Sequence, residues 1–178
     1  MPKAALSLRQ ISEIDLALCV RFNRACRYRA IRAVFRLASR AGDGVVWYAL
    51  MVALPVLYGP RAWHVVMQML VAGVAGLLVY KWLKRKTLRP RPFQVHPAIV
   101  VAGAPLDQFS FPSGHTLHAF SMALIVSHEF AEFVPALAML AAMISASRPI
   151  LGLHYPSDVL AGAAIGTSIA TIVLALPI

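Results

Sequence analysis

Three short polar clusters interrupt an otherwise apolar chain, and they contain the side chains that phosphate chemistry needs. The clusters are Lys84–Pro92, Pro112–His115 and Ser147–Asp158. Cations bind phosphate oxygens, histidines move protons or attack phosphorus, and a carboxylate can orient an imidazole. Ionisable side chains are costly at membrane level, so their concentration beside apolar segments predicts a functional site.

In the first cluster, Lys84 and Arg91 are seven residues apart, and Pro92 follows directly. An Arg guanidinium can bind two phosphate oxygens at once, whereas Lys acts as a mobile point charge. A basic stop signal at the end of a membrane span would have a similar composition. This cluster alone therefore does not decide between phosphate binding and topology.

The second cluster is typical of a helix that begins after a loop. Pro112 ends the loop, and Ser113 is a candidate N-cap. The amide of Gly114, at the positive end of a helix, can bind an anion, and His115 in the first turn can reach the same anion. A capped helix with an incidental histidine is the alternative.

The third cluster adds Arg148 as another cation, His154 as a potential nucleophile and Asp158 four residues later. We expect Asp158 to hydrogen-bond a ring nitrogen of His154, which would fix the tautomer and raise the nucleophilicity of the imidazole. A lone His-xxx-Asp pair would be unremarkable. Its occurrence after the other two clusters favours catalysis.

The elements that must position these clusters are membrane helices. The chain has 178 residues, of which 60% are hydrophobic and only 13% charged, well below the roughly 25% charged residues of soluble domains. We predict an all-α, polytopic membrane helix bundle with about five transmembrane helices. The expected spans are Val45–Tyr58, Ala62–Leu83, His115–Phe130, Phe133–Ala146 and Pro156–Ile178. This order brings all three clusters to one membrane face.

Two further features concern organisation and partners. Residues 1–43 are expected to form a basic amphipathic segment, an interfacial helix or helix pair, before a catalytic transmembrane domain at 44–178. The net charge is +10, but no nucleic-acid-binding module is recognisable, so the lipid bilayer and a phosphorylated lipid are the expected partners. Gly162 and Gly166 have the spacing of close helix packing.

Taken together, the motifs resemble those of the type 2 phosphatidic acid phosphatase (PAP2) superfamily of membrane lipid phosphatases. Its pattern is Lys-x6-Arg-Pro, then Pro-Ser-Gly-His, then Ser-Arg-x5-His-x3-Asp. Every fixed position is matched, by Lys84, Arg91, Pro92, Pro112, Ser113, Gly114, His115, Ser147, Arg148, His154 and Asp158.

The resemblance implies roles for these residues. His154 would attack phosphorus and form a phosphohistidine, Asp158 would orient it, and His115 would protonate the leaving group and then activate water. The phosphate would be bound by Lys84, Arg91, Ser113, Gly114 and Arg148. No metal and no cofactor is expected, because three fixed cations can offset a phosphate of about −2.

The expected function is hydrolysis of a terminal phosphate from a lipid phosphate or diphosphate, of the undecaprenyl diphosphate or the phosphatidylglycerol phosphate or phosphatidate type, with a prenyl diphosphate slightly favoured. Two alternatives remain: a phosphotransferase that passes the phosphoryl group to another lipid, and a non-catalytic protein that binds anionic lipids. The sequence carries no signal for the oligomeric state.

The expected location is the bacterial inner membrane, and two signals conflict about its sidedness. Of the 17 Lys and Arg residues, only Arg61 falls in the loops opposite the motifs, which by the positive-inside rule favours a cytoplasmic site. The resemblance implies the periplasmic face, and that is the expectation adopted.

Overall fold

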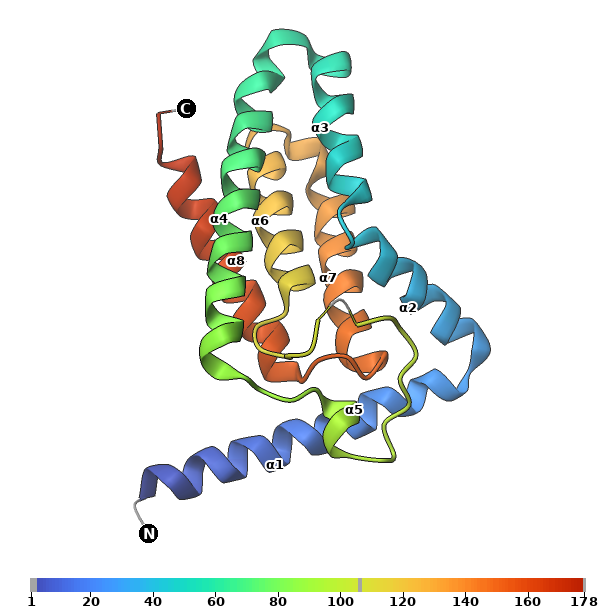
Figure 1. The fold of residues 1–178 in the computed structure, drawn as a ribbon. Coiled ribbons are helices and arrows are strands. Elements are labelled where there is room, and N and C mark those ends of the chain that lie inside the picture. Colours follow the sequence, from blue (N-terminus) through green and yellow to red (C-terminus); the bar gives the residue numbers. More distant parts are fainter. Residues whose placement is uncertain (1–2, 106, 178) are drawn as a thin grey trace.

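The computed structural model describes residues 3–105 and 107–177, and within these ranges the chain is helical with no assigned strand (Figure 1). The all-α prediction is confirmed. The helices are α1 (Lys3–Asn23), α2 (Arg29–Ala41), α3 (Val45–Tyr58), α4 (Trp63–Thr87), α5 (Pro92–Val95), α6 (Gly114–Glu129), α7 (Val134–Ile150) and α8 (Pro156–Leu174), with 3-10 turns at Arg24–Arg27, Gly59–Ala62 and Ala131–Phe133.

The N-terminal segment forms two helices rather than one. A 3-10 turn at Arg24–Arg27 joins α1 to α2, and α1 lies across the end of the bundle where the long loops gather (Figure 1). Both helices contact α7, and α1 also contacts α8. The segment is therefore packed against the last two helices, while its interfacial position in a membrane stays a prediction.

The bundle is organised around α6. Helices α3 and α4 form a hairpin through the turn at Gly59–Ala62, and α6 packs against α4, α7 and α8 (Figure 1). Many apolar side chains on the outer faces of α3 and α4 are exposed, among them Val52, Val56, Val74 and Leu78. Such a surface is compatible with lipid as its solvent.

Three stretches are long and apolar enough to cross a membrane: Val45–Thr87, which contains the α3–α4 hairpin, Ala131–Ile150 and Pro156–Leu174. The chain is thus an integral membrane protein. Helix α6 has 16 residues, which corresponds to about 24 Å of helix against a hydrocarbon core of about 30 Å. It is shielded by its neighbours, and the count of five spans remains a prediction.

Close packing of α6 on α8 depends on two glycines. A Cβ at Gly162 would lie 2.5 Å from the carbonyl oxygen of Ser113, and one at Gly166 would lie 2.2 Å from that of Leu117. The close packing predicted from their spacing is confirmed. The amide of Ser113 also donates to the carbonyl of Asp158 at 3.0 Å, so the beginnings of α6 and α8 are held together.

Candidate active site

The three polar clusters meet at one end of the bundle. They line the head of one cavity of about 390 Å³, to which α4 contributes Lys84, the turn before α5 contributes Arg91, and α7 contributes Arg148. The first turn of α6 and the loop before α8 add the two histidines, His115 and His154. Cluster residues as far apart in sequence as Lys84 and His154 therefore share one pocket.

Two of the three cations are engaged by a carboxylate. Asp107 accepts from Nζ of Lys84 through both oxygens at 2.6 Å, and its Oδ1 accepts from Nη2 of Arg91 at 2.9 Å. Burial alone would raise the pKa of Asp107, but the hydrogen bonds and charges of Lys84 and Arg91 outweigh it and lower the pKa below its usual value. The carboxylate therefore stays ionised on the cations expected to bind phosphate.

Arg148 differs from the other two cations because no carboxylate pairs with it among the described residues. Its side chain is 1% exposed, and its Nη1 donates to the hydroxyl of Ser39 at 2.6 Å. Its Nε is buried without a hydrogen-bond partner. A buried guanidinium with unused donors is a strong attractor for an anion in the same cavity.

His154 is held in a neutral form. Its side chain is 2% exposed, and burial, followed by the charges of Arg148 and Arg91, lowers its pKa well below the usual value. Its Nε2 lies 3.3 Å from Nη1 of Arg91. The neutral imidazole is the form that can attack phosphorus, so the surrounding cations would both attract an anionic substrate and keep the expected nucleophile unprotonated.

Asp158 lies behind His154, but the expected hydrogen bond is not formed. Nδ1 of His154 is 3.6 Å from Oδ2 of Asp158, beyond hydrogen-bonding distance, and has no hydrogen-bond partner. Hydrogen bonds to other groups hold the carboxylate in this position. Oδ2 accepts from the amide of Tyr155 at 2.9 Å, and Oδ1 accepts from Arg89 at 2.6 Å.

The second cluster begins α6 as predicted. The hydroxyl of Ser113 accepts from the amide of Thr116 at 3.4 Å, which confirms Ser113 as the N-cap. Gly114 and His115 line the cavity, whereas Ser113 is fully buried and does not. Its hydroxyl lies within hydrogen-bonding distance of both the amide and the hydroxyl of Thr116, and its expected contact with phosphate stays a prediction.

Comparison with known proteins agrees with this geometry. The profile of the PAP2 superfamily matches residues 61–177, well over half of the chain and all of the motif residues. The chain belongs to the PAP2 superfamily. It is a lipid phosphatase of this family, and the resemblance noted in the sequence is confirmed.

Relatives and solved structures of PAP2 proteins support the assignment. Decaprenylphosphoryl-5-phosphoribose phosphatase of Mycobacterium tuberculosis is 33% identical over 144 residues, covering 79% of this chain and 77% of the relative. Lipid A 1-phosphatase of Rhizobium johnstonii is 38% identical over 98 residues, covering 52% of this chain and 39% of the relative. The crystal structure of Aquifex aeolicus LpxE superposes with a TM-score of 0.75 at 26% identity, covering 90% and 94% of the two chains. A PAP2-type phosphatidylglycerolphosphate phosphatase of Bacillus subtilis shares the fold, with a TM-score of 0.76, 23% identity and coverage of 96% and 88%.

Several contacts to the PAP2 motif residues come from outside the matched region. Asp43, in the turn between α2 and α3, pairs through Oδ1 with Nε2 of His115 at 2.6 Å. Ser39, at the end of α2, accepts from Arg148. The sequence interpretation missed both, although an acid between two glycines, Gly42 and Gly44, was a visible signal.

A third supporting residue from outside the match, Asp15, reaches Asp158 through Arg89. Arg89 pairs with Asp158 through Nη1 and with Asp15 of α1 through Nη2, each at 2.6 Å. Asp15 accepts from the amide of Ser157 at 3.0 Å, and their side chains are also hydrogen-bonded. Arg89 belongs to the first basic cluster, but its role was missed because it is not a fixed position of the PAP2 pattern.

Proposed function

We propose that this PAP2 protein removes the terminal phosphate from a polyprenyl-linked lipid phosphate or diphosphate, through a phosphohistidine on His154. The observation that carries the proposal is the shape of the cavity, which joins a cationic head to an apolar arm. A lipid with one terminal phosphate fits this division because its chain and its headgroup need opposite environments.

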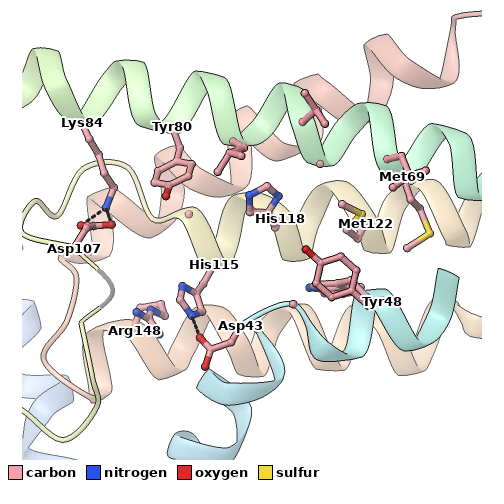
Figure 2. Close-up of a pocket in the computed structure, with 18 of the residues that line it drawn as sticks. Asp43, Tyr48, Met69, Tyr80, Lys84, Asp107, His115, His118, Met122 and Arg148 are labelled. Atoms are coloured by element: carbon pink, nitrogen blue, oxygen red, sulfur yellow. Dashed lines mark hydrogen bonds and ion pairs between the residues drawn. The ribbon is translucent and has the colours of Figure 1, made fainter. Parts of the chain in front are cut away.

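The apolar arm runs between α3, α4 and α6. It is lined by Trp47, Tyr48, Met51, Met69, Leu70, Gly73, Val74, Leu77 and Met122. Figure 2 shows Lys84, Asp107, Arg148 and His115 at one end of the pocket and Met69 and Met122 at the other. Methionine side chains adapt to irregular apolar ligands, which suits a branched prenyl chain. The mycobacterial relative, named for a decaprenyl-linked substrate, supports this class over a glycerophospholipid.

In the first chemical step, Nε2 of His154 attacks phosphorus while the bond from phosphorus to the lipid oxygen breaks. His115 gives its proton to that oxygen, so the lipid leaves as a neutral alcohol or as a monophosphate. Arg148, Lys84 and Arg91 bind the phosphoryl oxygens, with Lys84 and Arg91 released from Asp107. Charge on these oxygens is thereby stabilised in the transition state.

In the second step, water attacks the phosphohistidine. His115, now unprotonated, takes a proton from the water as the new oxygen–phosphorus bond forms and the bond to Nε2 of His154 breaks. Asp158 balances the positive charge of the phosphorylated imidazole. Inorganic phosphate then leaves, and Asp107 returns to the cations. The three fixed cations supply the positive charge for this chemistry without a metal ion.

We also propose that the active site faces the periplasmic side of a bacterial inner membrane. In this arrangement the end of α8, which lies at the opposite end of the bundle from the site (Figure 1), faces the cytoplasm. A cysteine introduced near Leu176 should resist a membrane-impermeant thiol reagent in intact cells. Labelling of that cysteine would reverse the orientation.

The activity is tested with purified protein and a panel of lipids. The panel contains a polyprenyl diphosphate, a polyprenylphosphoryl sugar phosphate, phosphatidylglycerol phosphate, phosphatidate and lipid A, with released phosphate as the readout. The polyprenyl substrates should have the highest kcat/KM. Transfer of labelled phosphate to another lipid instead of water would support the phosphotransferase alternative.

The phosphohistidine is tested separately with phosphate-labelled substrate and rapid quenching. With labelled p-nitrophenyl phosphate, whose leaving group departs without a proton, an acid-labile, base-stable label should accumulate on the protein, and more of it in His115→Asn, because loss of the base slows hydrolysis. His154→Ala is the control and should carry none. Turnover without any label on the wild-type protein or on His115→Asn would contradict the covalent route.

A further inference from the structure

We propose that Asp43 is the positioning residue for His115 in the phosphatase reaction; this inference rests on the function proposed above. Asp43 is outside the PAP2 match at 61–177 and outside its motifs, yet it makes the one hydrogen bond described for the His115 ring, at 2.6 Å. Figure 2 shows Asp43 against the imidazole at the edge of the pocket.

The hydrogen bond determines which nitrogen can serve the substrate. Asp43 accepts from Nε2 of His115, so this nitrogen carries a hydrogen. No hydrogen bond of Nδ1 is described in residues 3–105 and 107–177, and the residue lines the cavity. Nδ1 is therefore the nitrogen that faces the leaving group. A carboxylate that fixes the tautomer and stabilises the imidazolium is the usual partner of a catalytic histidine.

The chain is built to bring Asp43 to this place. A Cβ at Gly42 would lie 2.9 Å from Cδ2 of His115 and 2.9 Å from Cγ2 of Ile144, so only glycine lets the backbone approach α6 and α7 this closely. Gly44 has φ of 113°, a conformation that other residues rarely adopt. The flanking glycines thus serve the placement of the carboxylate.

The role of Asp43 is confined to holding the Nε2 hydrogen. In the first step, the proton on Nδ1 moves to the lipid oxygen as the oxygen–phosphorus bond breaks and the bond to His154 forms. In the second step, Nδ1 takes a proton from water. The hydrogen on Nε2 stays in place throughout, so Asp43 neither gains nor loses a proton and does not touch the substrate.

The decisive experiment compares two leaving groups. A lipid alcohol needs protonation as it departs, whereas nitrophenolate, released from p-nitrophenyl phosphate, leaves without it. Asp43→Asn keeps the shape of the side chain but removes its charge. It should lower kcat/KM, which reports only the steps up to the phosphohistidine, by about 10²-fold for the lipid substrate and by much less for p-nitrophenyl phosphate. Asp43→Glu should restore part of the loss.

Two comparisons separate positioning from general structural support. Ser39→Ala removes a contact from the same segment to Arg148 rather than to His115, so it should lower kcat/KM equally for both substrates. In a His115→Asn background, Asp43→Asn should have no further effect, since the two residues act as one unit. Thermal unfolding of each variant checks that it is folded.

Three results would overturn the inference: an equal loss on both substrates, a loss that adds to that of His115→Asn, or a gain in activity, which would make Asp43 a competitor of the substrate. None of these would affect the proposed function. That proposal fails separately, if the wild-type protein releases no phosphate from the polyprenyl lipids or carries no phosphate label during turnover.

Discussion

The region of the PAP2 match and the N-terminal segment before it contribute differently to the same site. From the matched region, Lys84, Arg91, His115, Arg148 and His154 line the cationic end of the cavity, where we propose that phosphate binds. Residues 1–43 mainly contribute supporting groups. Ser39 contacts Arg148, Asp43 contacts His115, and Asp15 contacts Arg89, which pairs with Asp158. Groups that meet the substrate are restricted in type by chemistry. Groups that support them need only reach the right atom, so they can come from any helix.

The largest effect is expected at a group that meets the phosphate directly. Arg148→Gln should lower kcat/KM by about 10²- to 10³-fold, the usual cost of removing one donor to a developing oxyanion. Arg148 is chosen because no carboxylate competes for it in the described residues. The measurement is phosphate release from the lipid substrate. A loss below tenfold would mean that the phosphate is bound elsewhere in the cavity.

The ion-pair network that links the N-terminal segment to the site should matter less. Arg89→Gln removes the bridge between Asp15 and Asp158 and leaves the Asp158 carboxylate buried without its cation. We expect kcat to fall by about 10- to 100-fold with KM nearly unchanged, since breaking a buried pair costs about 3–5 kcal/mol and only part of that reaches the transition state.

The matched variant is Asp15→Asn, which keeps the Arg89–Asp158 contact. It should cost less than Arg89→Gln, and the double variant should be no worse than Arg89→Gln alone, because both act through one network. Full additivity would show that α1 affects the site by another route.

The sequence predicted the helical bundle and most of the polar side chains that line the cationic end of the cavity, because composition and chemistry constrain both. A 60% hydrophobic chain requires membrane helices, and phosphate transfer requires cations and histidines at motif spacing. The supporting carboxylates were missed because no spacing rule links Asp43 to His115 or Asp15 to Arg89. A usable signal existed: the chain has only seven acidic residues, and each of its four Asp residues pairs with a base of the site.

Asp107 belongs to the PAP2-matched region, but like the N-terminal carboxylates it holds other side chains of the site. It therefore tests whether the matched region contributes only groups that meet the substrate. Its carboxylate occupies Lys84 and Arg91 and must be displaced by phosphate. Asp107→Asn should strengthen inhibition by inorganic phosphate by about tenfold, the effect of one charged hydrogen bond of about 1.5 kcal/mol. The inhibition constant is measured at fixed lipid substrate, with Gln108→Ala as a neighbouring control.

The effect of Asp107 should be independent of pH in the neutral range. Its pKa is lowered by Lys84 and Arg91, so its ion pairs stabilise the fold above the unfolded pKa of about 4 and are lost only as pH falls through the lower folded value. Between pH 6 and 8, the inhibition constants of wild type and Asp107→Asn for inorganic phosphate should therefore differ by a constant factor. A difference that disappears within this range would point to another titrating group.

The smallest expected effect is the absence of a titration at His154. Burial and the charges of Arg148 and Arg91 lower its pKa, so the folded protein binds no proton there as pH falls below about 6.5, although the unfolded chain does. This difference lowers the free energy of unfolding as pH falls from about 6.5 towards the folded pKa.

Nitrogen-15 spectra of histidine-labelled protein, with the His154 signals assigned by their loss in His154→Gln, should show a neutral ring at about pH 5.5. Added phosphate should raise the pKa of His154, since the anion offsets the charges that lowered it. A His154 ring that titrates normally without phosphate would mean that Arg148 and Arg91 do not lower its pKa. The distinction between groups that act on the expected nucleophile and groups that only support them would then not hold.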